Sequence, residues 1–443
     1  MSMGEDAKRT VCEMPLADGF RALSVAALAT RRANQLAFLP ADLPFTGQLH
    51  PRRGHVRYHS PMVLTGIDVL AQSKFRTLAG CRVGLVTNHT GLTASGQPTI
   101  DALFSAPGVT LAALFGPEHG IRGEFDQPSV ADSIDTATGL PVYSLYGART
   151  QPTAEQMKDL DTLVFDIQDI GCRFYTYLST LDQILLAAEG HQKRVVVLDR
   201  PNPITGTRIE GPLADLDKLA FVACHPLPVR HGLTLGEVAR LLRAEKKLTG
   251  SLEIVPCEGW KRSDWYDATG LLWTNPSPNM RRLSAAALYP GVGLLEFTNV
   301  SVGRGTGTPF EVFGAPYLDP RAFASALNAE SLPGVRFVPT YFTPTASVFA
   351  HERCGGVQIL VTDRDTLDAV RVGLTLATVL RRLHPQDWQP DKLMTLLVNQ
   401  KAYDGVLAGQ SYAEIAAGWA EDLRVFGERA QKWRLYEELK TPR

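Results

Sequence analysis

Short apolar runs alternate with amphipathic stretches along most of this chain after Met62. The apolar runs lie at residues 82–87, 110–115, 162–167 and 194–198. Within residues 177–189, apolar side chains recur at helical spacing, so one face of a helix there is suited to pack on a sheet. Strands that alternate with helices in this way predict an α/β fold built on a mostly parallel, Rossmann-like sheet.

The pattern changes near residue 285. A Gly- and Thr-rich stretch is followed by candidate strands near 335–338 and 357–361, and by a candidate helix at 367–383. With 443 residues, the chain also exceeds the roughly 250 to 300 residues at which single cores stop growing. We therefore expect three parts, which are an irregular N-terminal extension (1–61), a Rossmann-like domain (62–285) and a smaller C-terminal α/β lobe (286–443).

Two helix starts are marked by paired polar residues. Thr234 is followed three residues later by Glu237, and Ser411 by Glu414. This is the spacing of a capping box, so we expect helices to begin directly after Thr234 and Ser411.

Composition and charge narrow the range of partners and locations. Lys and Arg number 45 and Asp and Glu 46, so no positive field would attract nucleic acid. No apolar run approaches the roughly 20 residues that span a bilayer. The apolar patch at 22–29 is short and is followed by Arg31 and Arg32, which is untypical of a signal peptide. We expect no integral membrane association and a cytoplasmic location, with a periplasmic or secreted location as the alternative.

Polar residues follow each of the four predicted strands. In open parallel sheets, ligands bind outside the carboxyl ends of the strands. Sequence order therefore predicts that Asn88, Glu118, Asp169 and Arg200 meet at one rim. The competing interpretation is that such residues cap the helices that follow, although Pro117 makes a poor helix start around Glu118.

Three other kinds of site lack their motifs. The turn after the first strand has no G-x-G-x-x-G for a dinucleotide, and the Gly-rich run 303–308 has no Walker lysine. His89, His119 and His231 do not form an H-E-x-x-H helix, and the adjacent Glu118 and His119 would normally point apart. No G-x-S-x-G elbow is present. We therefore expect neither a metal nor a nucleotide cofactor.

Carboxylate chemistry is the remaining possibility. Glycosidic cleavage commonly needs one carboxyl group that protonates the leaving oxygen and a second group that attacks or activates water. Glu118 is the candidate acid, with Asp169 and Glu296 as possible second groups. Tyr175 and Asn275 could hold a sugar, although aromatic residues more often pack in cores and amides often form turns.

A set of longer motifs resembles one enzyme family. The segments are GLVTNHTG (84–91), LFGPEHGIRG (114–123), GLPVYSLYG (139–147), FDIQDIGCRFYTYLSTL (165–181), LDRPNPI (198–204), PVRHGLTLGE (228–237), WTNPSPNMR (273–281), YPG (289–291) and EFTNVSVGRGTGTPFEVFGAPY (296–317). Together, and in this order, they resemble the exo-β-N-acetylmuramidases of glycoside hydrolase family 171. The turn after the GIRG motif, residues 124–127, departs from the family pattern because it is not Ala- or Gly-rich.

The resemblance implies a function and a set of site residues. It implies a Rossmann-like lobe that carries the active site, a smaller lobe that closes a cleft over it, and release of N-acetylmuramic acid from the non-reducing end of peptidoglycan fragments during cell-wall recycling or salvage. It makes Glu118 the favoured catalytic residue, with Asp169, Glu296 or the acetamido group of the substrate as the second participant. The candidate substrate contacts are Asn88, His119, Arg173, Tyr175, Arg230, His231, Asn275, Asn299 and Arg304.

Selectivity for muramic acid requires a cation. Muramic acid differs from glucosamine by a lactyl ether whose carboxylate a guanidinium can bind through two hydrogen bonds. The candidates are Arg230, Arg304 and Arg173, in that order, and the alternative for each is a surface position or a structural ion pair.

Two other functions stay open from the sequence. One is a muropeptide-binding protein without turnover, against which the intact Glu118 argues. The other is a sugar deacetylase that uses the same cleft, against which the absent metal-ligand spacing argues.

Overall fold

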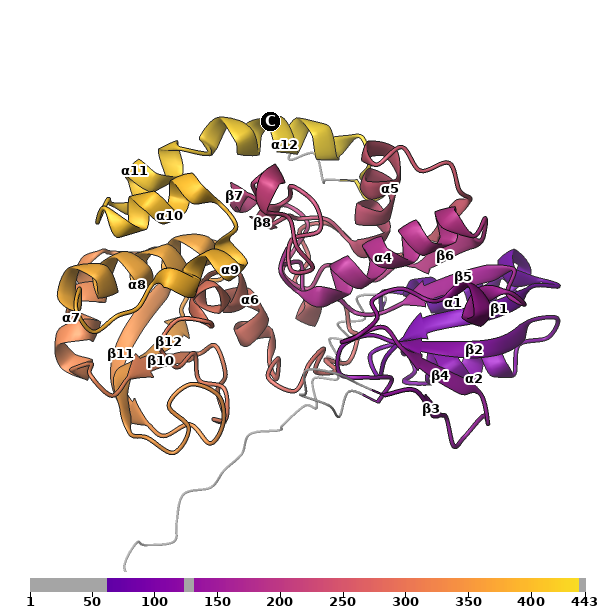
Figure 1. Ribbon diagram of the computed structural model, residues 1–443, viewed down its shortest axis with the longest axis horizontal. Helices are drawn as coiled ribbons and strands as arrows, with labels where there is room; N and C mark the ends of the chain where they lie inside the picture. Colours follow the sequence, from indigo (N-terminus) through magenta and orange to yellow (C-terminus); the bar gives the residue numbers. More distant parts are fainter. Residues whose placement is uncertain (1–61, 123–130, 438–443) are drawn as a thin grey trace, which may run out of the picture. The chain divides into compact units, whose positions relative to one another are not determined.

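The computed structural model describes residues 62–122 and 131–437. The expected N-terminal extension, the departure at residues 124–127 and the end of the C-terminal lobe lie outside the described residues. The described chain is organised around one large sheet and one small sheet with helices packed against them (Figure 1).

The large sheet has seven strands, of which all but one pair run parallel to their neighbours. In spatial order they are β3 (Ser133–Ile134), β4 (Pro141–Ser144), β2 (Thr110–Gly116), β1 (Arg82–Thr87), β5 (Thr162–Asp166), β6 (Arg194–Leu198) and β9 (Leu252–Val255). Only the pair β3 and β4 is antiparallel in this sheet. The four central strands are those that the apolar runs predict, and the α/β fold with a mostly parallel sheet is confirmed.

Helices cover both faces of this sheet. Side chains alternate between the two faces along each strand, and because both sets are apolar, each face packs against helices. On β6, Val195 and Val197 belong to the same apolar cluster as α4 (Thr176–Gly190) and α5 (Leu235–Glu245). Val196 and Leu198 belong instead to the cluster that contains the apolar side chains of α1 (Gly66–Gln72) and α2 (Thr99–Phe104). The short α3 (Ala154–Met157) precedes β5. Thr234 and Glu237 form the predicted capping box at the start of α5.

The smaller C-terminal region has an antiparallel three-stranded sheet and several helices. Its elements are α6 (Leu283–Val292), β10 (Val312–Ala315), α7 (Pro320–Ala329), β11 (Val335–Phe342), β12 (Cys354–Val361), α8 (Ala369–Leu383), α9 (Met394–Leu397), α10 (Gln400–Leu407), α11 (Tyr412–Ala417) and α12 (Ala420–Gln431). The capping box of Ser411 and Glu414 is formed as predicted. Helices α6 and α8 cross at Gly291 and Gly373, where a Cβ on Gly291 would overlap the carbonyl oxygen of Ala369.

The two regions share one continuous apolar core, which includes side chains of α4 and α5 as well as α6 and α8. The small hairpin of β7 (Glu210–Leu213) and β8 (Pro228–Arg230) also contacts α8. The domain boundary at residue 285 stays a prediction.

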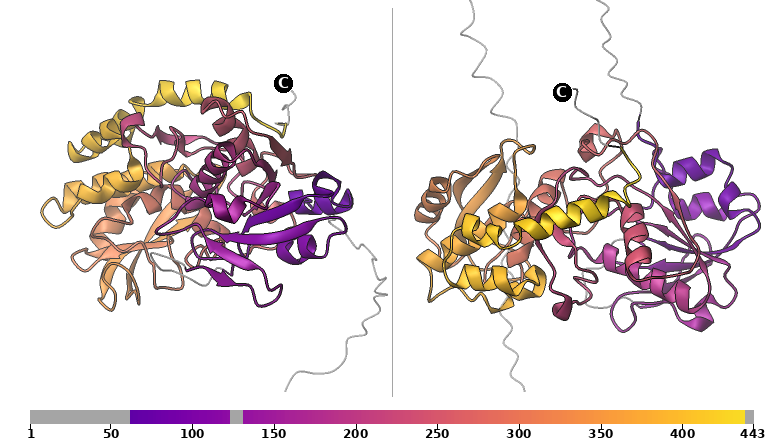
Figure 2. Two further views of the ribbon diagram at one scale, coloured as in Figure 1. Left: turned by 45° about the vertical axis from the view of Figure 1, so that its right-hand side comes forward. Right: turned by 90° about the horizontal axis from the view of Figure 1, so that it is seen from above.

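After α12, the chain returns to the large sheet (Figure 2). The Tyr436 hydroxyl donates a hydrogen bond to Oδ2 of Asp199, directly after β6, at 2.6 Å. The backbone N–H of Leu435 donates to Oε1 of Glu237 at 2.8 Å, and the same oxygen accepts from Arg262 at 2.5 Å. We call residues 433–436 the C-terminal strap, and it provides hydrogen bonds to two buried carboxylates of the sheet domain.

Candidate active site

Two of the predicted carboxyl groups line the same cavity. Glu118 follows β2, and Glu296 follows the 3₁₀ turn Gly293–Leu295 at the end of α6. The cavity has a volume of about 130 Å³ and is partly open to solvent. It is lined by Glu118, His119, Tyr146, Phe174, Tyr175, Thr176, Val222, Ser277, Tyr289, Glu296, Phe297, Arg304, Phe310 and Leu396.

A tight turn and a neighbouring helix position Glu118. The N–H of Gly120 donates to the carbonyl of Pro117 at 2.9 Å, and His119 has a φ of 71°. Both Glu118 and His119 line the cavity. The hydroxyl of Thr176, the first residue of α4, donates to Oε2 of Glu118 at 2.5 Å.

Glu296 faces the cavity together with a cation. Arg304, in the Gly-rich loop, forms an ion pair with Glu296, and the two side chains are 26% and 11% exposed. The guanidinium also lies 5.8 Å from the centre of the Phe310 ring. The Gly-rich loop therefore provides an arginine for the cavity, and the predicted contact of Arg304 with substrate stays a prediction.

Aromatic rings form much of the cavity wall. Tyr289 packs edge-to-face on Tyr175 and on Phe310, with ring centres 5.8 and 4.7 Å apart. Burial raises the pKa of the Tyr289 phenol well above its ordinary value, and the negative charges of Glu296 and Glu118 contribute in the same direction. Tyr289 thus lies near both carboxyl groups. Its role as a wall was not predicted, although the YPG motif at 289–291 was a signal.

Asp169 is placed differently from the other two candidates. It does not line the cavity, and its Oδ2 accepts a hydrogen bond from the N–H of Gly171 at 2.6 Å. Burial raises the pKa of its carboxyl group to about 7. Among the three predicted carboxyl groups, Glu118 and Glu296 are therefore the pair that the structure brings to one cavity.

The buried Asp169 is expected to make stability depend on pH. Its raised pKa means that the folded state keeps a proton which the unfolded chain loses near pH 4, so its contribution to stability decreases between pH 4 and 7. Asp169→Asn should raise the free energy of unfolding by an amount on the order of a few kcal/mol at pH 8 and change it little at pH 4. Urea unfolding across this pH range measures the effect, with the exposed Asp159→Asn as control. Parallel pH profiles for Asp169→Asn and the wild type would contradict this expectation.

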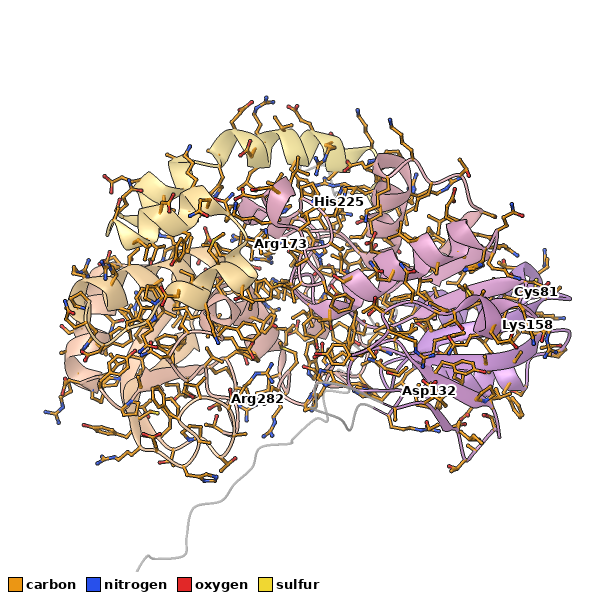
Figure 3. All side chains as sticks on the ribbon, in the orientation of Figure 1. Cys81, Asp132, Lys158, Arg173, His225 and Arg282 are labelled. Carbon is orange, nitrogen blue, oxygen red and sulfur yellow. The ribbon has the colours of Figure 1, made fainter. Side chains whose placement is uncertain are left out.

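Arg173, labelled in Figure 3, is fully buried and binds backbone carbonyls rather than lining the cavity. Its Nη1 donates to the carbonyls of Pro212 and Leu227, both at 3.0 Å. Its Nη2 donates to the carbonyls of Leu396 and Leu397 in α9, at 2.8 and 2.7 Å. This side chain joins the two regions of the protein and does not line the cavity, and its predicted contact with a substrate carboxylate stays a prediction.

Arg230, the first choice from the sequence, has a similar structural role. It is 1% exposed, and its Nη1 binds Oε1 of Glu210 at 2.5 Å. The other oxygen of Glu210 accepts from the N–H of Ala369 at the start of α8, at 2.9 Å. The ion pair thus fixes α8 to the sheet domain, and Arg230 does not line the cavity. The hydrogen bonds and ion pair of Arg173 and Arg230 favour a structural role for both, the alternative to substrate binding.

Two predicted contacts from the sheet domain also lie outside the cavity. Asn88 is 2% exposed, and its Oδ1 accepts from the N–H of Thr90 at 2.9 Å, so it organises the turn after β1. His231 is 1% exposed, its Nδ1 accepts from the N–H of Leu233 at 3.2 Å, and burial lowers its pKa to about 3. Each of these buried side chains thus accepts a hydrogen bond from the backbone of its own turn.

Asn275 and Asn299 do not line the cavity themselves, although Ser277 and Phe297 from the same loops do. The carbonyl of Asn275 lies 2.6 Å from Nε2 of His89, so it joins its loop to the turn after β1. The Asn299 amide donates to the carbonyl of Asp387 at 2.8 Å and accepts from the N–H of Gln389 at 2.7 Å. Asn299 therefore holds the loop after α8 in place.

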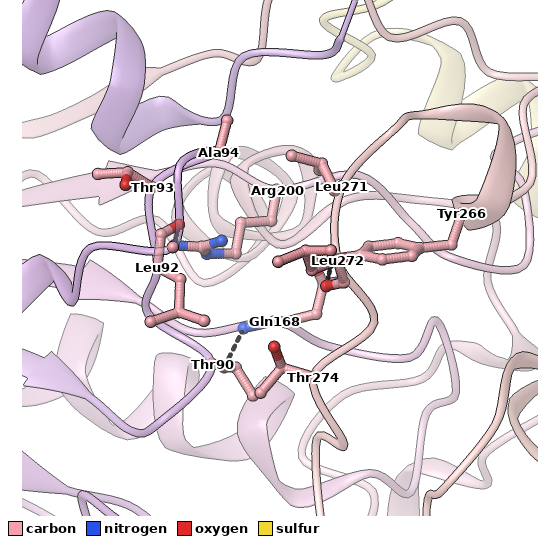
Figure 4. A pocket seen from close by; sticks show the side chains of 11 residues that line it. Thr90, Leu92, Thr93, Ala94, Gln168, Arg200, Tyr266, Leu271, Leu272 and Thr274 are labelled. Atoms are coloured by element: carbon pink, nitrogen blue, oxygen red, sulfur yellow. Dashed lines mark hydrogen bonds between the residues drawn. The ribbon is translucent and has the colours of Figure 1, made fainter.

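A second, smaller cavity lies beside the carboxyl ends of β1 and β5 (Figure 4). It is lined by Thr90, Gln168 and Arg200, among others. Arg200 binds both oxygens of Asp166 at 2.6 and 2.9 Å. Of the four residues predicted to share one rim, Glu118 lines the first cavity and Arg200 the second, while Asn88 and Asp169 line neither. Asn88, Glu118 and Asp169 all lie close enough to Tyr177 to influence its phenol group.

The described residues lack two other features. Across residues 62–122 and 131–437, no three His, Cys, Asp or Glu side chains gather as a metal ion would require. No helix in those ranges has the length and apolar character needed to cross a membrane.

Two carboxyl groups that face one cavity with aromatic walls are typical of sites that cleave glycosidic bonds. Here the cavity lies at the carboxyl edge of a mostly parallel sheet, where such folds commonly bind ligands. The fold and the site thus have the features of an α/β glycosidase.

Comparisons with known proteins agree with this class. The family models described as exo-beta-N-acetylmuramidase NamZ, N-terminal and C-terminal, match residues 83–284 and 287–436. The chain is 41% identical over 382 residues to the peptidoglycan beta-N-acetylmuramidase NamZ of Bacillus subtilis (strain 168), covering 85% of this chain and 92% of that protein. The chain therefore belongs to the exo-beta-N-acetylmuramidase NamZ family, as its motifs predicted.

Two crystal structures of DUF1343 family proteins from Bacteroides fragilis NCTC 9343 are also similar. The first is 37% identical with a TM-score of 0.75, and the second is 29% identical with a TM-score of 0.69. Each comparison covers 85% of this chain and 99% of the solved chain. The likeness extends over both sheets and confirms the fold class.

Proposed function

We propose that this protein is an exo-acting glycosidase that removes N-acetylmuramic acid from the non-reducing end of peptidoglycan fragments, in the recycling or salvage of cell wall. The observation that carries the proposal is that Glu118, Glu296 and Arg304 line one cavity with aromatic walls. Family membership supports the same activity. The cytoplasmic location stays a prediction.

Glu118 is the proposed general acid and base. In the first step its carboxyl proton moves to the glycosidic oxygen as the bond to the anomeric carbon breaks, and the next sugar leaves as an alcohol. The Thr176 hydroxyl, 2.5 Å from Oε2, orients the carboxyl group. Water then adds to the anomeric carbon and returns a proton to Glu118, so that free N-acetylmuramic acid is released.

Glu296 is the favoured second participant because it lines the same cavity, whereas Asp169 does not. Arg304, paired with Glu296, provides positive charge at the same place. The acetamido group of the substrate is the alternative nucleophile, and in that case Glu296 and Arg304 orient the sugar.

An aryl N-acetyl-β-muramide, assayed beside the matching N-acetylglucosaminide, tests the activity. We expect rapid release of the aryl group from the muramide alone, and release of N-acetylmuramic acid from a disaccharide fragment. Tight binding without release would favour a muropeptide-binding protein. Release of acetate would favour a deacetylase.

Arg304 is expected to provide the selectivity for muramic acid in this assay. Arg304→Met should lower kcat/KM for the muramide roughly 10-fold to 100-fold, the effect of losing about 1.5 to 3 kcal/mol from a charged hydrogen bond. Because Arg304 also pairs with Glu296, the diagnostic quantity is the ratio of kcat/KM for muramide and glucosaminide. Arg282→Met, at a side chain that is 58% exposed, is the matched control. An unchanged ratio in Arg304→Met would mean that other groups bind the lactyl carboxylate.

A further inference from the structure

One large apolar side chain at the cavity is exposed to solvent. Phe297 directly follows Glu296 and is 48% exposed. Among the large hydrophobic residues that are exposed in the described part of the chain, it is the one that lines this cavity. Exposed apolar surface beside a ligand site commonly marks a contact with that ligand.

The other rings of the cavity have a different position. Phe174, Tyr175, Tyr289 and Phe310 are each less than 8% exposed and belong to the main apolar core. They also pack on one another in tilted or edge-to-face pairs. In the described residues, Phe297 has no such ring partner and does not belong to a core cluster. Its ring therefore has free surface that the packing of the protein does not use.

An apolar surface beside the cavity can bind the sugar on the leaving-group side of the cleaved bond. The terminal sugar lies between the carboxyl groups, and the rest of the substrate extends from the leaving oxygen toward solvent. The face of a pyranose ring carries C–H groups, which pack well on an aromatic ring and bury apolar area. Phe297 combines such a ring with a position next to Glu296 and with contact to solvent.

We propose that Phe297 is a stacking platform for the sugar on the leaving-group side of the cleaved bond, an N-acetylhexosamine. This inference rests on the proposed glycosidase function and adds a determinant of how the enzyme distinguishes saccharides from simple glycosides. Phe297 acts by binding and orienting the leaving sugar, so that its glycosidic oxygen is held at the Glu118 carboxyl group. It takes no part in proton transfer.

The experiment compares two leaving groups in the same protein. One substrate is a disaccharide of N-acetylmuramic acid linked to N-acetylglucosamine, and the other is trifluoroethyl N-acetyl-β-muramide, whose leaving group is small and has no ring. Phe297→Ala should lower kcat/KM for the disaccharide about 10-fold, the upper range for one aromatic contact. The trifluoroethyl glycoside should change by less than about 2-fold. Phe297→Trp, which keeps an aromatic face, should retain most of the activity on the disaccharide.

Phe104→Ala is the matched control. Phe104 is 50% exposed, at the end of α2, and does not line the cavity, so its loss should leave both substrates unaffected. If Phe297→Ala lowers kcat/KM equally for both substrates, or for neither, the proposal that Phe297 stacks on the leaving sugar is wrong. If the wild type cleaves neither substrate, the proposed function fails and this inference fails with it.

Discussion

Glu118→Gln is expected to lose about 100-fold to 10,000-fold in kcat on a muramic acid disaccharide, the range for one general acid and base. The amide has nearly the same shape as the carboxyl group, and its oxygen can still accept the hydrogen bond of Thr176. It cannot transfer an acidic proton to the leaving oxygen. Stopped assays of released N-acetylmuramic acid measure the loss, and calorimetric binding of the intact disaccharide checks that the site is preserved.

The leaving group separates the role of Glu118 from that of its partner. From a dinitrophenyl muramide, the dinitrophenolate leaves with little need of a proton, so Glu118→Gln should be much less impaired on this substrate than on the disaccharide. Glu296→Gln should lose similar activity on both substrates if Glu296 attacks the anomeric carbon or orients the sugar. Glu155→Gln, at a side chain that is 77% exposed, is the control. Wild-type turnover of the disaccharide by Glu118→Gln would show that the acid is elsewhere.

Arg173→Met is expected to lower the free energy of unfolding by about 3 to 5 kcal/mol, since it removes several buried hydrogen bonds to a charged group, each contributing about 1.5 to 3 kcal/mol. The guanidinium binds four backbone carbonyls from three segments of the chain. Methionine fills part of the volume but donates no hydrogen bond, so buried acceptors would lose their partner. Urea unfolding followed by tryptophan fluorescence measures the change.

Two further variants define the effect of Arg173. Arg173→Lys keeps the charge but lacks the planar fork, so it should recover only part of the lost stability. Arg382→Met, at a side chain that is 55% exposed, should stay within about 0.5 kcal/mol of the wild type. A loss below about 1 kcal/mol in Arg173→Met would show that these carbonyls find other partners.

The elements with long apolar runs or clear caps were predictable from the sequence. The runs at 82–87 and 194–198 have the same bounds as β1 and β6, because buried parallel strands are continuously apolar. β9 was not predicted, because a four-residue strand at the edge of a sheet gives little periodic signal. The antiparallel order of β10, β12 and β11 was also not predicted, because strand pairing depends on tertiary contacts.

The candidate site was predictable in part. Glu118, Glu296 and Arg304 lie in motifs, and the structure brings them to one cavity. Arg173 and Arg230 lie in similar motifs, yet both are buried. Arg173 binds backbone carbonyls, and Arg230 forms an ion pair with Glu210. Sequence alone does not distinguish the two cases, because an arginine that binds a substrate and one that binds backbone carbonyls are equally polar. Burial and hydrogen-bond partners decide between them, and both appear only in the folded chain.

The C-terminal strap has a consequence for how the protein is made. Domains generally fold in order as the nascent chain leaves the ribosome. Here the carboxylates of Asp199 and Glu237 receive hydrogen bonds from Tyr436 and Leu435, which are translated after both sheets. The sheet domain thus emerges early but completes its buried hydrogen bonds only when the strap arrives. Until then, a nascent or prematurely terminated chain exposes an incomplete surface that chaperones and proteases can recognise.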